Sequence, residues 1–286
     1  MTEYLAPEVE RLLAAGEAVV VATVVEARGS TPRAAGARMA VAATTIIGTI
    51  GGGNLEWEVV QRARDMIASG GSSDLLDVPL GPAMGQCCGG HVVLRLERAD
   101  AAAASALAQA EAREELEAPQ LAIFGAGHVG KALVRACAPL PLRILWADTR
   151  REEFPAGVAE SIEVDHADPV ETVRRAEPDA AVVVVTHNHA LDFAITEAAL
   201  RRTDLAYVGL IGSRTKRRRF ERWFTARGGD AAALANLVSP IGEFGVSDKR
   251  PAVIAALVAA EVLRALAPRG RLGDGRAAQQ EREDAI

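Results

Sequence analysis

The sequence has only three cysteines in 286 residues, and two of them, Cys87 and Cys88, are adjacent. Three cysteines provide neither a disulfide framework nor the spacing of a structural zinc site. Two adjacent thiolates also cannot wrap around a tetrahedral metal ion. The cysteine content therefore favours a reducing compartment, and we expect a cytoplasmic protein.

The sequence also lacks a long apolar run and an excess of positive charge. No uninterrupted apolar segment approaches the roughly 20 residues that a membrane-spanning helix needs. The opening residues, MTEYLAPEVERLL, do not combine a basic start with a continuous apolar core, so they predict no secretory signal. The net charge of −6 gives no global electrostatic reason to bind nucleic acid. We therefore expect neither membrane nor nucleic acid as a partner.

The remaining composition is that of an ordinary globular protein, with 49% hydrophobic and 24% charged residues. We predict an α/β protein in which an N-terminal α+β domain over 1–98 precedes a Rossmann-like, doubly wound parallel-sheet domain over 120–267. An Ala-rich and then acidic segment over 99–119 predicts a helical connector between them. Residues 268–286 lose all periodicity, and we expect a disordered tail there.

The clearest local pattern is a glycine turn in the second half. Four mostly apolar residues, 121–124, predict a buried parallel strand and run directly into Gly125, Gly127 and Gly130. This is the glycine spacing of a dinucleotide-binding turn. The first glycine permits a tight turn, the second lets a phosphate approach the backbone, and the third lets helix and strand pack closely.

The residues after the turn predict the rest of a Rossmann half-fold. A helix pattern over 131–138 would present free amide N–H groups to a phosphate at its N-terminus. A second strand pattern over 142–147 ends in Asp148, at the distance where a ribose hydroxyl would find a carboxylate acceptor. The pattern predicts the fold more firmly than it predicts a bound NAD(P), which stays open.

Two loops of the N-terminal half carry unusual residues. Two arginines, two hydroxyl groups and a glycine lie within 28–33, a loop that includes Ser30 and Arg33. The loop reads equally well as a wide hairpin turn or as an anion-binding loop. The glycines at 51–53 fit a close approach of either a neighbouring strand or a ligand. Glu56, in the first turn of the following helix, suits the helix dipole and needs no functional role.

The cysteine pair lies in a glycine-rich loop. Cys87 and Cys88 stand between Gly85 and Gly89, where burial is unexpected and soft-ligand or thiol chemistry is favoured over a packing role. Cys137 lies on the helix after the glycine turn, and we expect it in the core.

A third polar loop follows the fully apolar strand pattern over 180–185. His187, His189 and Asp192 lie there, where loops after parallel strands line a ligand crevice. Helix capping with solvent-facing histidines is the alternative. A metal site has less support, because the spacing of the two histidines and the aspartate does not match a metal-binding motif that we can justify from coordination geometry. After the next strand pattern, Arg214 stands where it could pair with a phosphate, and the further basic residues up to Arg222 read mostly as a solvated face.

Six segments, in this order, resemble one family, the XdhC/CoxI family of xanthine dehydrogenase accessory proteins, over nearly the whole chain. These segments are Gly29–Arg33, Ile50–Gly53 with Glu56, Gln86–Gly90, Phe124–Gly130, Thr186–Asp192 and Leu210–Lys216.

The resemblance implies a chaperone without turnover of its own, so we expect no enzyme. Such proteins bind the molybdenum cofactor (molybdopterin) as cargo, promote its sulfuration by a cysteine desulfurase and deliver it to the molybdenum subunit of xanthine dehydrogenase. They work beside the proteins of molybdenum cofactor biosynthesis, and we expect a homo-oligomer. Cys88, or with less support Cys87, would contact the molybdenum or its sulfur. The expected cofactor-binding residues are Ser30, Arg33, Cys87, Cys88, Gly125, Gly127, His128, Gly130, Asp148, His187, His189, Asp192 and Arg214.

Two other classes of protein remain open on the sequence. In an NAD(P)-dependent oxidoreductase, Asp148 would bind the ribose and His187 or His189 would donate a proton. That class leaves the cysteine pair unexplained. In a thiol redox or persulfide carrier, Cys88 would react and the Rossmann domain would serve as a scaffold.

Overall fold

The structure, a computed structural model, describes residues 4–81 and 89–269. Contacts within the chain divide it between Glu114 and Glu115 into two compact units, and each is described by itself. The predicted cysteine pair, Cys87 and Cys88, lies outside the described residues, as does all of the expected tail except residues 268–269.

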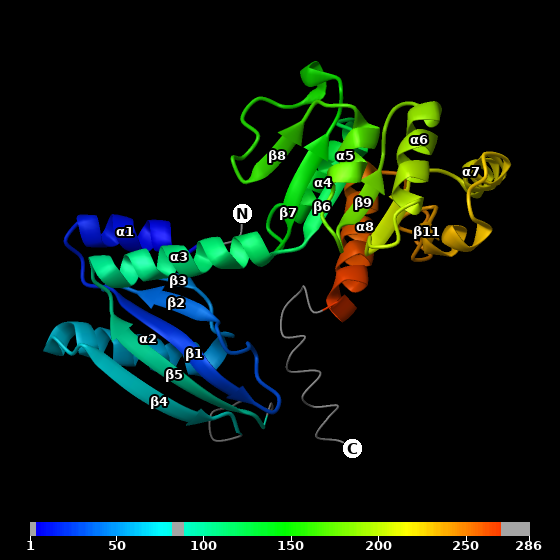
Figure 1. Ribbon diagram of the computed structural model, residues 1–286. Coiled ribbons are helices and arrows are strands. Elements are labelled where there is room, and N and C mark those ends of the chain that lie inside the picture. Colours follow the sequence, from blue (N-terminus) through cyan, green and yellow to red (C-terminus); the bar gives the residue numbers. More distant parts are fainter. Residues whose placement is uncertain (1–3, 82–88, 270–286) are drawn as a thin grey trace. The chain divides into compact units, whose positions relative to one another are not determined.

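The N-terminal unit is an antiparallel sheet with helices on both faces (Figure 1). The strand order is β3-β2-β1-β5-β4. The elements are α1 (Ala6–Ala14), β1 (Val20–Arg28), β2 (Arg38–Val41), β3 (Ile46–Gly48), α2 (Gly53–Ser69), β4 (Ser73–Pro79), β5 (His91–Arg98) and α3 (Ala101–Glu117).

Alternating side chains of β1 explain why this sheet needs helices on both faces. Val20, Ala22 and Val24 are buried against α2, which contributes Leu55 and Val59. Val21, which lies between Val20 and Ala22, points to the opposite face, where α1 and α3 cover it. The two faces give the unit two small cores in place of one.

The C-terminal unit is a six-stranded parallel sheet in the order β11-β10-β9-β6-β7-β8. Its elements are β6 (Gln120–Phe124), α4 (His128–Cys137), β7 (Arg143–Ala147), β8 (Ile162–Asp165), α5 (Pro169–Arg175), β9 (Ala181–Val184), α6 (His189–Leu200), β10 (Tyr207–Leu210), α7 (Arg214–Ala226), β11 (Leu237–Val238) and α8 (Pro251–Leu266). Short 3₁₀ turns lie at Arg151–Glu153, Ala231–Asn236 and Ala267–Arg269.

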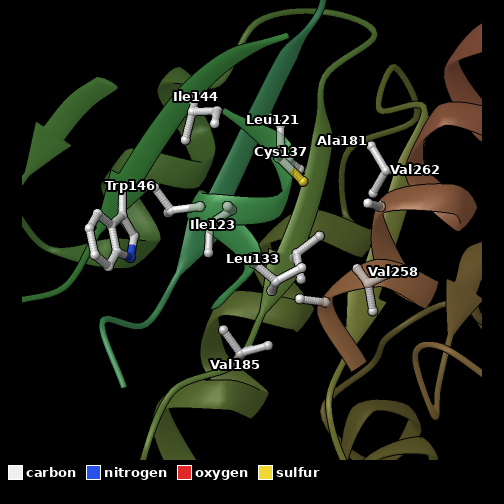
Figure 2. Close-up of a cluster of buried hydrophobic side chains, with 14 of the residues drawn as sticks. Leu121, Ile123, Leu133, Cys137, Ile144, Trp146, Ala181, Val185, Val258 and Val262 are labelled. Atoms are coloured by element: carbon white, nitrogen blue, oxygen red, sulfur yellow. The ribbon is translucent and has the colours of Figure 1, made fainter. Parts of the chain in front are cut away.

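Helices cover both faces of this parallel sheet, and the predicted fold class is confirmed. One face packs against α4 and α8, where Figure 2 shows Leu133, Cys137, Val258 and Val262 in the same cluster as strand residues. The other face packs against α5, α6 and α7. Every residue of β6 is buried, as expected for a central strand of a doubly wound sheet.

The order of the strands reverses between β6 and β9. From β6 the chain adds β7 and β8 on one side, and then β9, β10 and β11 on the other. Ligands of such sheets bind at the carboxyl ends of the strands beside this reversal. The loop after β6 and the loop after β9 touch there, because a Cβ atom on Gly125 would lie 2.5 Å from the carbonyl oxygen of Val185. The fold therefore directs attention to the loops after β6 and β9.

None of the helices in the described ranges combines the length and the apolar character needed to cross a bilayer.

Cys137 is fully buried, as predicted, and burial raises the pKa of its thiol to about 11. We therefore expect Cys137 to resist a thiol-specific reagent at pH 8 in the native protein, because so little thiolate is present. Mass spectrometry of the labelled peptides measures this, with urea-denatured protein as the control in which all three cysteines react. Modification of native Cys137 as fast as in urea would contradict its burial. If Cys137 does not react, any labelling of the native protein reports on Cys87 and Cys88 alone. Modification of neither Cys87 nor Cys88 would exclude a reactive-thiol carrier.

Candidate functional site

The three glycines of the turn after β6 serve two different purposes. A Cβ atom on Gly130 would lie 1.8 Å from the carbonyl oxygen of Gly125, so α4 can pack this closely only without a side chain at 130. Gly125 itself has φ of +125°, a conformation that favours glycine. Gly127, in contrast, has φ of −72° and nothing within 4 Å of an added Cβ atom. Its openness leaves room for a group that approaches the turn from outside.

The backbone amides at the N-terminus of α4 have no side-chain cap. The helix begins at His128, and its N-cap Gly127 supplies no side-chain hydrogen bond to the first-turn amides. Such amides, together with the positive end of the helix dipole, form the ordinary phosphate site of Rossmann units. The predicted phosphate position at this turn is thus compatible with the geometry.

Two side chains at the carboxyl end of β7 hold the turn in place. The indole Nε1 of Trp146 donates a hydrogen bond of 3.0 Å to the carbonyl of Gly125. Oδ2 of Asp148, two residues further on, accepts one of 2.8 Å from the amide of Ala126. Residues two apart in an extended chain point to the same side, so both reach the same turn. The turn is therefore preorganised by buried partners.

Asp148 has little acceptor capacity left for a ribose. Besides the Ala126 amide, its oxygens accept hydrogen bonds from the amide, Nε and Nη2 of Arg150, at 2.8–3.1 Å. Burial raises the pKa of the Asp148 carboxyl, but the hydrogen bonds from Arg150 and Ala126 outweigh it and hold that pKa below its usual value. A ribose hydroxyl would have to displace Arg150, so the ribose role stays a prediction while the bracing role is observed.

The loop after β9 is organised around the buried carboxylate of Asp192. Its Oδ1 accepts hydrogen bonds from the hydroxyl and the amide of Thr186, at 2.7 and 3.1 Å. Its Oδ2 forms an ion pair with Nζ of Lys216, and Nδ1 of His189 lies 4.0 Å away. The side chains of Asp192 and Lys216 are only 1% and 11% exposed. This buried pair joins the loop after β9 to α7.

Capping, the alternative role for this loop, uses a different residue. The side chain of Asn188 accepts hydrogen bonds from the amides of Ala190 and Leu191 and so caps α6. His187 and His189 are exposed and take no part in that cap. Capping therefore accounts for Asn188 and leaves the two histidines available.

A cavity of about 660 Å³ opens between α6 and α7, beside the carboxyl ends of β9 and β10. Three of the predicted residues, His187, His189 and Asp192, lie together in its wall. Arg214 does not line it and instead forms an ion pair with Glu243. The full lining is Thr186, His187, His189, Ala190, Asp192, Phe193, Ile211, Gly212, Ser213, Thr215, Lys216, Arg219 and Trp223.

Sequence reasoning missed Lys216, Arg219, Phe193 and Trp223. The run of basic residues predicts a solvated helix face, yet Lys216 and Arg219 both line the cavity. The helical spacing of Lys216, Arg219 and Trp223, at three and seven residues, places them on one face of α7 and was the available signal.

The N-terminal unit brings three predicted segments together. A Cβ atom on Gly90 would lie 2.2 Å from the carbonyl oxygen of Ser30, and one on Gly51 would lie 2.5 Å from the ring of Pro32. The loops at 29–33 and 50–53 and the end of the cysteine segment are therefore neighbours. Ser30 and Arg33 are both exposed there.

Glu56 organises the triple-glycine loop, a role that sequence reasoning did not assign to it. Its Oε1 accepts hydrogen bonds from the amides of Ile50, Gly51 and Gly52 at 2.9–3.2 Å, and also binds the hydroxyl of Thr49. Burial raises the pKa of the Glu56 carboxyl, but these donors together bring it below its usual value. The carboxylate thus holds three successive amides in one orientation.

Within the described ranges, no group of three His, Cys, Asp or Glu side chains is arranged to hold a metal ion.

Comparison with known proteins matches both units. Residues 121–262 match the XdhC Rossmann domain, and residues 12–79 match the XdhC and CoxI family. The chain is 29% identical over 262 residues to the uncharacterized protein YqeB of Escherichia coli (strain K12). That alignment covers 85% of the chain and 42% of YqeB, so the chain spans less than half the length of this relative.

One solved structure shares the fold over nearly the whole length. It is the crystal structure of a protein from Bacillus halodurans described as a xanthine dehydrogenase, BH1974. The TM-score is 0.74 at 19% identity, with 94% of this chain and 97% of the other covered. At this identity the likeness speaks for the fold alone. The two domain matches, in chain order and over most of the sequence, show that the chain belongs to the XdhC and CoxI family.

Proposed function

We propose that this protein is an accessory protein of xanthine dehydrogenase or a related molybdenum hydroxylase, which binds the molybdenum cofactor, supports its sulfuration and inserts it. The observation that carries the proposal is the cavity between α6 and α7, lined by Lys216, Arg219 and two histidines on a Rossmann unit of the XdhC family. Cationic and imidazole side chains together with apolar ones such as Phe193 and Trp223 suit an anionic, heterocyclic cargo better than they suit catalysis on a small neutral substrate.

The residues of the chain would hold the cargo in three ways. Amides at the start of α4, beside the open Gly127, would accept a phosphate. The α6–α7 cavity would receive a further anionic or ring portion. The thiolate of Cys88, a soft ligand, would contact the molybdenum or its sulfur. The molybdenum chemistry belongs to the cargo, and the protein would only bind, orient and release it.

The N-terminal unit supplies a reason to keep Cys88 in this scheme. The segment that contains the cysteines ends at Gly90, whose backbone packs against the loop of Ser30 and Arg33. In this scheme Arg33 of that loop would attract an anionic cargo toward the end of the segment that contains Cys88. In this proposal the partners are the molybdenum subunit of the receiving enzyme, a cysteine desulfurase and the proteins that make the cofactor, and the carrier is a homo-oligomer.

The molybdenum and pterin content of the protein tests the proposal. After anaerobic purification from cells that make the cofactor, we expect near-stoichiometric molybdenum and pterin in the native protein and a loss of both in Cys88→Ala. The matched control is Cys137→Ala, which removes a buried thiol and should keep the cargo. Retention of full cargo by Cys88→Ala would remove that residue from the site, and an empty native protein would defeat the carrier proposal.

An NAD(P)-dependent oxidoreductase is the second candidate, favoured by one observation, the open glycine turn at Gly127. The engagement of Asp148 by Arg150 and Ala126 weighs against it, because the carboxylate that would accept the ribose hydroxyls already has these donors. The same purification decides between the two: copurified NAD(P) in a protein without molybdenum would favour the oxidoreductase. A change in NADH fluorescence on mixing would support that outcome.

A further inference from the structure

The polar end of the α6–α7 cavity is built to attract an anion. Both helices begin there, at His189 and Arg214, so the positive ends of two helix dipoles meet at its mouth. Asp192 is the one carboxylate in the lining, and Lys216 already neutralises it. Arg219 also lines the cavity and has no ion-pair partner among residues 4–81 and 89–269. Arg219 therefore leaves a net positive charge in the lining that no carboxylate of the described residues pairs with.

The position of Lys216 is fixed from two sides. Asp192 holds its Nζ, and the absence of a side chain at Gly212 leaves room for its aliphatic stem. A Cβ atom on Gly212 would lie 2.5 Å from Cδ of Lys216. The ammonium group is thus oriented before any ligand arrives, which reduces the entropy lost on binding. Asp192 acts through Lys216 and is a positioning residue.

The other end of the cavity is aromatic. Phe193 of α6 and Trp223 of α7 both line it, with ring centroids 5.5 Å apart. Trp223 follows Lys216 by seven residues, which is about 10 Å along a helix. A flat, two-ring heterocycle that carries a phosphate has this length and this separation of charge from apolar surface.

We propose that the α6–α7 cavity binds the phosphomonoester of a flat heteroaromatic ligand, with Lys216 and Arg219 on the phosphate and Phe193 and Trp223 against the ring. The site is separate from the glycine turn, because no residue of that turn lines the cavity. The inference rests on the proposed function only for the natural ligand, which would be a phosphate-bearing heterocycle of the cargo. Binding of a simple probe needs no molybdenum cofactor.

The test uses 4-methylumbelliferyl phosphate as the probe, with the full-length protein and isothermal titration calorimetry. We expect it to bind at least roughly tenfold more tightly than 4-methylumbelliferone, which lacks the phosphate, and than inorganic phosphate, which lacks the ring. Arg219→Met should weaken the phosphorylated probe by roughly tenfold. Arg218→Met is the matched control, since it removes the same charge from an exposed neighbour on α7 that does not line the cavity.

A second variant covers the buried pair. Asp192→Asn combined with Lys216→Met removes both charges, keeps the net charge and should also weaken the probe by roughly tenfold. Equal loss in Arg218→Met and Arg219→Met would reduce the effect to general electrostatics and overturn the site. Loss of binding in Gly127→Ala alone would move the probe to the glycine turn and overturn it too. If the protein binds the probe but never carries molybdenum, this inference stands and the proposed function fails. If it carries molybdenum but does not bind the probe, the proposed function stands and this inference fails.

Discussion

Replacing Gly130 by alanine is expected to destabilise the C-terminal unit by about 3 kcal/mol or more, the upper end of the cost of overpacking. The added methyl would stand 1.8 Å from the carbonyl oxygen of Gly125, which cannot move freely because it accepts the hydrogen bond of Trp146. Relief would require α4 to withdraw from the sheet. Urea unfolding followed by tryptophan fluorescence measures the effect, in a Trp57→Phe background so that the remaining indoles report only on the C-terminal unit.

Gly127→Ala is the matched control for Gly130→Ala. The backbone at 127 has an ordinary φ of −72°, and an added Cβ atom meets nothing within 4 Å. Its cost should stay below about 1 kcal/mol, the difference between glycine and alanine at an N-cap. If both variants unfold at the same urea concentration, the close packing of α4 on the turn is wrong.

This pair also shows what the sequence can and cannot say about a glycine turn. The spacing of Gly125, Gly127 and Gly130 predicted the turn and the helix that follows it, because Gly125 and Gly130 each answer a local steric demand. The spacing did not predict that Trp146 and Asp148 would brace the turn. The position of Asp148 in the sequence is that of a ribose acceptor. Its hydrogen bonds from Arg150 depend on how the chain turns after β7, which the spacing does not reveal.

Long-range partners explain the other omissions. Lys216 lies in a run of basic residues that is typical of a solvated face, and only the sheet order brings it to Asp192, 24 residues earlier in the chain. Glu56 suits a helix dipole locally, and its three amide partners became visible only with the loop in place. The strand Ser73–Pro79 went unpredicted because most of its side chains lie exposed or half-buried at a sheet edge, so little apolar alternation marks it.

Removal of the charge at Lys216 alone is expected to destabilise the C-terminal unit by about 3–5 kcal/mol, the usual cost of leaving one member of a buried ion pair unpaired. In Lys216→Met the carboxylate of Asp192 keeps its two hydrogen bonds from Thr186 but loses its counter-ion while only 1% of its side chain is exposed. Urea unfolding in the Trp57→Phe background measures this loss as a drop in the unfolding midpoint.

The double variant Asp192→Asn with Lys216→Met provides the decisive comparison. Asparagine retains an oxygen acceptor for Thr186 and carries no charge to desolvate, so most of the stability lost in Lys216→Met should return. A double variant as unstable as Lys216→Met would mean that packing of the lysine stem over Gly212, and not the ion pair, stabilises this region. Recovery would show that this buried pair is not needed for stability, so that its place in the wall of the α6–α7 cavity, where the ammonium can meet an anion, is the better reason for the charge.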